Sequence, residues 1–162
     1  MLELREFEQE FIVDAATFVV KNERVEAEAY IEFLKRTDLG RQYPRENFSA
    51  RIATLVQHVP VSLILRDEAG TIVGICFGLT DFAYWLFLTD LGIDKRYERK
   101  GFGKLLMRLA HDLAGGEDSI IQLLCANDAA LPFYTKAGMK VATDVMVKDS
   151  VAWTVFDVKE MD

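Results

Sequence analysis

The segment from Ile93 to Lys104 combines residue types that are suited to binding phosphate. Gly101 and Gly103 are separated by one residue, and an apolar helical pattern begins directly after them. The start of a helix offers unpaired backbone N–H groups and the positive end of the helix dipole, where anions bind. Glycine lets a phosphate approach the backbone without a side chain in the way. Three cations surround the same turn: Arg99, Lys100 and Lys104.

Two common nucleotide-binding motifs do not fit this turn. A dinucleotide fingerprint requires a third glycine three residues after the second, and Leu106 occupies that position. A Walker loop requires four residues between its glycines and a Lys-Ser or Lys-Thr pair, whereas Lys104 is followed by Leu105. The residues therefore predict a phosphate site that lacks both motifs.

The elements on either side of the turn predict a strand–helix–strand unit. Residues 84–93 are rich in aromatic and branched side chains, which favours a strand. Apolar residues then recur at helical spacing until Gly115-Gly116. Residues 119–126 are nearly all apolar, as is typical of a central strand covered on both faces. A short helix is expected over 128–137, ending at Gly138.

The remaining segments predict early helices and an antiparallel meander. We expect a helix over 22–36 with Asn22 as its cap, and a second helix that begins near Pro44. The segment 11–20 is compatible with a strand or a helix, and we favour a strand. Four further strands are predicted over residues 61–66, 71–79, 140–147 and 151–158. This order indicates a mixed α/β fold and not a doubly wound one.

Length and composition narrow the class of protein. The chain has 162 residues, of which 51% are hydrophobic, so we expect one domain over 1–162. No apolar run approaches the roughly 20 residues that span a bilayer, so we expect no membrane partner. The first residues lack the pattern of a signal peptide, which predicts a cytoplasmic protein. The net charge of −7 argues against a nucleic-acid partner. Cys76 and Cys125 are expected to be reduced core residues, and the absence of clustered Cys and His predicts no metal site.

A second motif lies between Asn127 and Gly138. It matches the pattern Asn-x-x-Ala-x-x-Phe-Tyr-x-Lys-x-Gly at every anchor position. Together with the glycine turn and the order of elements, it resembles the GNAT superfamily of acetyl-CoA-dependent N-acetyltransferases. The motifs cover roughly the last two thirds of the chain, and the element order covers most of it. The resemblance implies a single-domain fold whose mixed, mostly antiparallel sheet of about six or seven strands is flanked by helices, with a splayed central strand pair.

The resemblance also implies a binding site for acetyl-CoA as the acetyl donor, without a metal. Backbone N–H groups of residues 99–104 would hold the pyrophosphate. The strand edge near Leu91 and Ile93 would pair with the pantetheine arm, and Asn127 would reach that arm from the other side. The full set of implied binding residues is Leu91, Gly92, Ile93, Glu98, Arg99, Lys100, Gly101, Phe102, Gly103, Lys104, Asn127, Ala130 and Tyr134.

Glu98 departs from the family pattern, in which Arg or Gln usually stands three residues before the first glycine. One interpretation is that its carboxylate repels the pyrophosphate and weakens cofactor binding. The interpretation we favour is that backbone N–H groups hold the cofactor while Glu98 points to solvent or pairs with Arg99 or Lys100, because exposed charge is screened.

Acetyl transfer to an amine needs a neutral amine, a stabilised oxyanion and a protonated leaving thiolate. For a lysine-like amine, reaching the neutral form at pH 7 costs on the order of 4 to 5 kcal/mol. The resemblance implies Tyr134 as the proton donor to sulfur, against the alternative of an aromatic ring that only packs on the cofactor.

Asp90 is the candidate base, although Thr89 stands where many relatives carry Glu. A carboxylate that bonds backbone at a bulge or fixes a neighbouring loop is an equal alternative for Asp90. Residues 38–43 are implied to border the acceptor pocket.

These residues predict an N-acetyltransferase that acts on a primary amine of a small molecule by direct attack in a ternary complex. Two alternatives stay open: a GNAT-like module that binds acyl-CoA without catalysis, and a protein or peptide N-acetyltransferase. A homodimer is one option for the assembly, because dimers are frequent among relatives. The apolar surroundings of Cys125 argue against an acyl-enzyme at that thiol.

Overall fold

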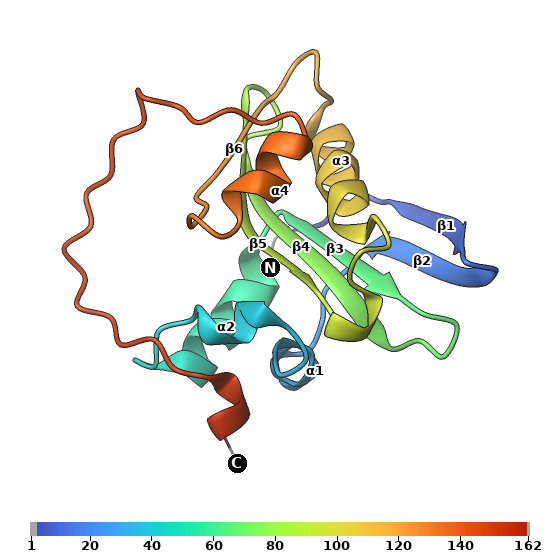
Figure 1. Ribbon diagram of the computed structural model, residues 1–162, viewed down its shortest axis with the longest axis horizontal. Helices are drawn as coiled ribbons and strands as arrows, with labels where there is room; N and C mark the ends of the chain where they lie inside the picture. Colours follow the sequence, from blue (N-terminus) through green and yellow to red (C-terminus); the bar gives the residue numbers. More distant parts are fainter. Residues whose placement is uncertain (1–2, 162) are drawn as a thin grey trace.

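The computed structural model describes residues 3–161 and contains one six-stranded sheet in which neighbouring strands follow the order of the sequence (Figure 1). The strands are β1 (Glu8–Val13), β2 (Ala16–Asn22), β3 (Val61–Arg66), β4 (Ile72–Thr80), β5 (Trp85–Ile93) and β6 (Ile121–Leu124). The α-helices are α1 (Ala27–Leu34), α2 (Phe48–His58), α3 (Phe102–Ala114) and α4 (Leu131–Lys136). Three short 3₁₀ helices are η1 (Asp38–Arg41), η2 (Lys95–Tyr97) and η3 (Val158–Glu160).

The sheet is mixed and mostly antiparallel, which confirms the predicted fold class. Strands β1 to β5 pair as an antiparallel meander, and β6 pairs with β5 in the parallel direction. A parallel neighbour requires a crossover connection, and α3 provides it. The strand–helix–strand unit predicted around the glycine turn is therefore present.

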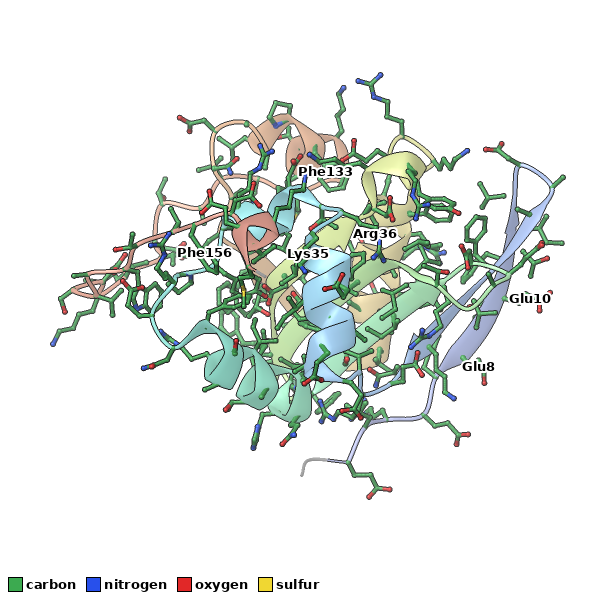
Figure 2. All side chains as sticks on the ribbon, turned by 90° about the horizontal axis from the view of Figure 1, so that it is seen from below. Glu8, Glu10, Lys35, Arg36, Phe133 and Phe156 are labelled. Carbon is green, nitrogen blue, oxygen red and sulfur yellow. The ribbon has the colours of Figure 1, made fainter. Side chains whose placement is uncertain are left out.

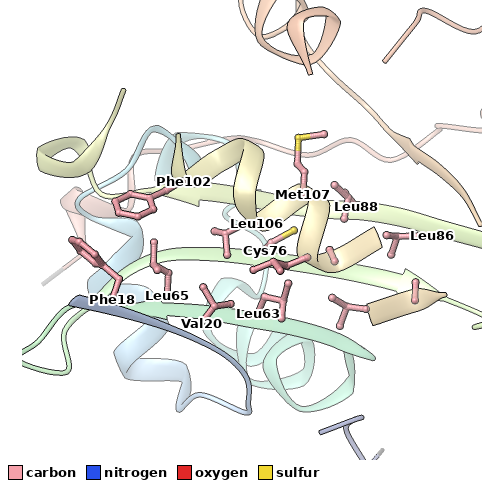
Figure 3. Packing of buried hydrophobic residues seen from close by; sticks show 14 of the residues in the cluster. Phe18, Val20, Leu63, Leu65, Cys76, Leu86, Leu88, Phe102, Leu106 and Met107 are labelled. Carbon is pink, nitrogen blue, oxygen red and sulfur yellow. The ribbon is translucent and has the colours of Figure 1, made fainter. Parts of the chain in front are cut away.

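Helices cover the sheet on both faces and bury two apolar clusters. On one face, Phe102, Leu106 and Met107 of α3 pack against the inner side chains of the strands, as Figure 3 shows. On the other face, Tyr30 and Phe33 of α1 join residues of α2 and the sheet. Strand β3 is buried on both faces, and its continuous apolar run reflects that position.

The N-terminal third differs from the sequence prediction in its boundaries. The strand predicted over 11–20 is a hairpin of β1 and β2, because Asp14 and Ala15 both adopt positive φ and form a tight turn. Asn22 was wrongly predicted as a helix cap. It is the last residue of β2, and its amide instead bonds the Arg5 carbonyl and the Ser62 N–H, so α1 begins at Ala27.

The two predicted closing strands over 140–147 and 151–158 are wrong. This segment runs away from the sheet as an exposed loop, and Met146 is 95% exposed (Figure 1). A strand requires a partner for its backbone groups, and the end of the segment finds one elsewhere. The N–H of Arg45 donates to the Thr154 carbonyl at 2.7 Å, beside an isolated bridge between Pro44 and Val155.

The same contacts explain two further differences from the sequence prediction, at the start of α2 and at β6. Pro44 takes part in this bridge, so α2 begins at Phe48 and not near Pro44. Without the closing strands, β6 has β5 as its single neighbour in the described sheet, and it is a half-exposed edge strand instead of a central one.

Candidate functional site

Strands β5 and β6 separate at the middle of the sheet. Their pairing ends where Leu88 faces Leu124, while β5 continues to Ile93 beside β4 alone. The backbone edge of residues 89–93 is therefore released from β6. The structure thus contains the splayed strand pair that the resemblance implied, and it places Leu91, Gly92 and Ile93 along the open edge.

A bulge in β5 sets the direction of the Asp90 side chain. Phe77 pairs with Asp90 and Gly78 pairs with Leu88, so Thr89 is one extra residue on β5. Bulges bend a strand and reorient the side chains that follow. Asp90 consequently lies 9% exposed beside the apolar cluster under α1 and α2.

A cavity of about 160 Å³ lies at the splay. Its walls come from β5, from the end of β6 and from α4, and they include both predicted catalytic residues. The residues most relevant to chemistry are Asp90, Leu91, Cys125, Asn127, Ala130 and Tyr134. Leu39 and Gln42 also line it, so part of the segment 38–43 borders this cavity.

Asp90 is held by a hydroxyl that sequence reasoning missed. Tyr43 donates a hydrogen bond to Oδ1 of Asp90. Burial raises the pKa of Asp90, and hydrogen bonds from Tyr43 and Thr89 oppose that rise without cancelling it. Tyr43 lies in the segment expected to border the acceptor pocket, but no motif in the sequence marks its hydroxyl.

Tyr134 reaches the same cavity from α4. Its ring is half-buried, and burial is the main cause that raises the pKa of its hydroxyl. A phenol with a raised pKa remains protonated at neutral pH and can donate a proton. The structure therefore brings a buried carboxylate and a protonated phenol to one cavity.

The glycine turn precedes α3 and opens toward solvent. Arg99 and Gly101 both have positive φ, and the first helical hydrogen bond runs from the Leu105 N–H to the Gly101 carbonyl. The preceding N–H groups therefore stand at the free start of the helix. Space beside the Gly101 Cα is open, whereas a Cβ on Gly103 would lie 3.0 Å from the Phe133 ring. Gly101 leaves room for an anion, and Gly103 lets α4 approach α3.

The charged side chains of the turn point to solvent. Glu98, Arg99 and Lys104 are exposed, and Lys100 forms an ion pair with Asp14 of the β1–β2 turn at 2.6 Å. Among residues 3–161, Glu98 is in no ion pair. Of the two arrangements expected for Glu98, the structure has the one in which its side chain points to solvent, while Lys100 pairs with Asp14.

Asp94 anchors the chain between β5 and this turn. Its side chain is 1% exposed and accepts from Arg36 Nε at 2.8 Å and from Arg96 Nη2 at 2.9 Å. It also accepts from the backbone N–H of Arg96, which caps η2. Burial alone would raise the pKa of Asp94, but the bonds from Arg96 and Arg36 lower it below its usual value. Arg36 lies just past the end of α1, and Phe133 lies on α4, as labelled in Figure 2.

Residues 21–139 match the acetyltransferase (GNAT) family. The chain belongs to this family. No curated protein shows significant similarity to the chain. Among solved structures, a GNAT family acetyltransferase from Streptococcus pneumoniae is similar at 17% identity and a TM-score of 0.60, over 84% of this chain and 99% of that one.

Two further structures with the same fold are described by their activities. Glucosamine-6-phosphate N-acetyltransferase from Arabidopsis thaliana is 18% identical, with a TM-score of 0.57 over 83% of this chain and 99% of that chain. An aminoglycoside N-acetyltransferase in complex with CoA is 12% identical, with a TM-score of 0.61 over 86% and 99%. At these identities the likeness shows the GNAT fold and not a substrate.

The second GNAT motif is arranged around the start of α4. Oδ1 of Asn127 accepts from the Ala130 N–H at 2.9 Å, so this amide oxygen stabilises the turn before the helix. The two cysteines differ: Cys76 is buried, whereas Cys125 is exposed at the cavity. The expectation that Cys125 belongs to the core is wrong, because Cys125 lies just past the end of the edge strand β6, at the cavity. Both thiols are free, as expected.

Residues 3–161 contain neither a metal-binding cluster nor a membrane-spanning helix. No group of three or more His, Cys, Asp or Glu side chains lies close enough to hold a metal ion. No helix in the same described range is long and apolar enough to cross a membrane.

Proposed function

We propose that this GNAT protein transfers the acetyl group of acetyl-CoA to a primary amine of a small molecule, by direct attack in a ternary complex. The observation that supports it best is the meeting of Asp90 and Tyr134 at one cavity, where β5 and β6 separate.

The residues present support a donor site for acetyl-CoA. The open edge of Leu91, Gly92 and Ile93 would pair with the pantetheine amides. The free N–H groups from Gly101 to Lys104 would hold the pyrophosphate, with Arg99 and Lys100 adding positive charge nearby. When bound, acetyl-CoA supplies the activated thioester. The space beside Gly101 suits this ligand, because a side chain there would stand at the helix start.

In the proposed transfer, Asp90 and Tyr134 handle the protons that leave the acceptor nitrogen and the proton that reaches sulfur. Asp90 accepts one proton from the acceptor's ammonium group, which leaves a neutral amine. The nitrogen lone pair forms the C–N bond at the thioester carbonyl, and the C–S bond breaks with its electron pair on sulfur. Tyr134 gives its proton to that sulfur, and the second nitrogen proton returns the phenol to its neutral form. The Asp90 proton then leaves to solvent.

Thiol release from acetyl-CoA, measured across a panel of primary amines, tests this proposal. We expect turnover with at least one amine, and a fall in kcat of about 10²-fold in Tyr134→Phe with CoA affinity retained. Tyr84→Phe is a matched control, because Tyr84 is 69% exposed. Full kcat in Tyr134→Phe would remove the phenol from the mechanism.

The same assay separates the alternative functions. Tight CoA binding without turnover on any amine would favour an acyl-CoA-binding module. A mass increase on peptides, without turnover on small amines, would favour a protein or peptide N-acetyltransferase.

A further inference from the structure

Two tyrosine hydroxyls form a hydrogen-bonded chain that ends on the Asp90 carboxylate. The Tyr30 hydroxyl lies 2.8 Å from the Tyr43 hydroxyl, and Tyr43 donates to Oδ1 of Asp90. Tyr30 belongs to α1, Tyr43 lies between η1 and α2, and Asp90 belongs to β5. Three elements distant in sequence thus meet at one carboxylate.

Each tyrosine hydroxyl has a single proton, and this sets the direction of both hydrogen bonds. A phenol has one proton to donate, and Tyr43 gives it to Asp90. The bond between the two tyrosines therefore needs Tyr30 as the donor. Both O–H groups then point toward the carboxylate, which stabilises its ionised form.

Aromatic packing restricts the positions of both hydroxyls. The Tyr30 ring is fully buried, with its centroid 5.0 Å from that of Phe77, the residue that pairs with Asp90 across the sheet. The Tyr43 ring meets Phe48 of α2 edge-on at 5.9 Å. The hydroxyls are consequently fixed before any ligand binds.

We propose that Tyr43 is a positioning residue for proton transfer at Asp90, and that Tyr30 orients Tyr43. This inference rests on the proposed acetyltransferase function. The bond to Oδ1 fixes the plane of the carboxylate and favours its ionised form, so that Asp90 takes one proton from the acceptor's ammonium group in a defined orientation. Without the Tyr43 hydroxyl, Asp90 would stay protonated to a higher pH.

The other groups that interact with Asp90 keep their protons at neutral pH. Burial raises the pKa values of Tyr30 and Tyr43 well above the usual value. Burial also raises the pKa of the Cys76 thiol on β4, and the nearby Asp90 adds to that rise. Thr89 on β5 contributes a hydrogen bond. Within this described cluster, Asp90 is therefore the group expected to change charge during turnover.

The pH profile of thiol release tests the role of Tyr43. In Tyr43→Phe we expect the acidic limb of kcat/KM to move up by about one pH unit, because a hydrogen bond to the ionised form is lost. We also expect kcat to fall about tenfold, with the KM for acetyl-CoA unchanged. Tyr30→Phe should shift the limb in the same direction by less, and Tyr84→Phe should leave it in place.

A second variant keeps the test decisive if Tyr43→Phe does not fold. Replacing Tyr43 alone with 3-fluorotyrosine retains the ring and makes the hydroxyl a stronger donor. The acidic limb should then move to lower pH, opposite to Tyr43→Phe. A purely structural role predicts no shift in either variant, and that result would overturn the proposal.

A titration without turnover separates this inference from the proposed function. Carbon-13 carboxyl NMR of the protein, with Asp90→Asn to assign the Asp90 signal, reports its pKa directly. If wild type releases no thiol with any amine, the acetyltransferase proposal fails, and the catalytic role of Tyr43 fails with it. If turnover occurs but Tyr43→Phe leaves the Asp90 pKa unchanged, the positioning role alone is overturned.

Discussion

Asp90 and Asp94 are four residues apart, both are buried, and they have opposite surroundings. Asp90 interacts with the neutral hydroxyl of Tyr43 beside the cavity, and its pKa is raised. Asp94 interacts with the guanidinium groups of Arg36 and Arg96, and its pKa is lowered. Burial acts in the same direction on both carboxyls, so their partners make the difference.

Of these two carboxylates, Asp90 is the one suited to proton transfer. Cationic partners keep Asp94 ionised, so it serves as a fixed anchor for the turn that begins α3. Neutral partners leave Asp90 able to take up and release a proton. Two aspartates, one on β5 and one just past its end, thus have two roles, proposed base and scaffold, and substitutions at the two positions should have separable effects.

Asp90→Asn is expected to have the largest effect, and it should reduce catalysis without reducing stability. We expect kcat to fall about 10³-fold, because no carboxylate remains to accept the ammonium proton. The free energy of unfolding at pH 7 should stay the same or rise, because a carboxylate with a raised pKa is costly to keep ionised. Steady-state kinetics and urea unfolding measure the two quantities. A large loss of stability would show that Asp90, like Asp94, stabilises the fold.

Asp94→Asn should have the converse effect. We expect a loss of about 3 kcal/mol in the free energy of unfolding, because Arg36 and Arg96 would lose their shared carboxylate. CoA affinity should weaken as η2 and the glycine turn lose their anchor, while kcat of the folded enzyme changes little. Urea unfolding and calorimetric CoA titration test this, and a loss of kcat with unchanged stability would contradict it.

The two arginines that bind Asp94 offer a matched pair. Arg36 is 33% exposed at its side chain and also donates to the Ile72 carbonyl at 2.7 Å, whereas Arg96 is 64% exposed. We expect Arg36→Met to cost about 2 kcal/mol of stability and Arg96→Met about 0.5 kcal/mol. Equal losses in urea unfolding would show that exposure does not separate their contributions.

The pH dependence of stability should differ in sign between the two carboxyls. The stability that Asp94 contributes is present above its unfolded-state pKa of about 3.9 and is lost as the pH falls through its lowered folded pKa. For Asp90, the ionised form is the costly one, so stability falls as the pH rises from about 3.9 through its raised folded pKa. Unfolding of wild type, Asp90→Asn and Asp94→Asn across this range measures both slopes, and slopes of the same sign would contradict the assignments.

The sequence predicts much of this arrangement because its signals are local. The glycine turn, the helical period of α3 and the motif from Asn127 to Gly138 each depend on neighbours within one element. The strand boundaries of β3 and β5 also agree within a residue. These elements suffice to predict the fold class, and the family resemblance that they carry is what connects Asp90 and Tyr134 in one hypothesis.

The remainder depends on contacts between distant residues. No local pattern indicates that Tyr43 bonds Asp90, or that Arg36 reaches Asp94. Asn22 has the residue type of a helix cap, yet its amide is used between strands. The apolar residues of 140–158 have strand propensity, but the loop before α2 binds the backbone at Thr154. Propensity does not specify a pairing partner.

The most direct test of the central claim is the pH profile of kcat/KM for thiol release from acetyl-CoA with an active amine, compared among wild type, Asp90→Asn and Asp94→Asn. We expect an acidic limb in wild type that persists in Asp94→Asn and disappears in Asp90→Asn, which should show a low rate without that limb. An unchanged limb in Asp90→Asn would contradict the assignment of Asp90 as the base.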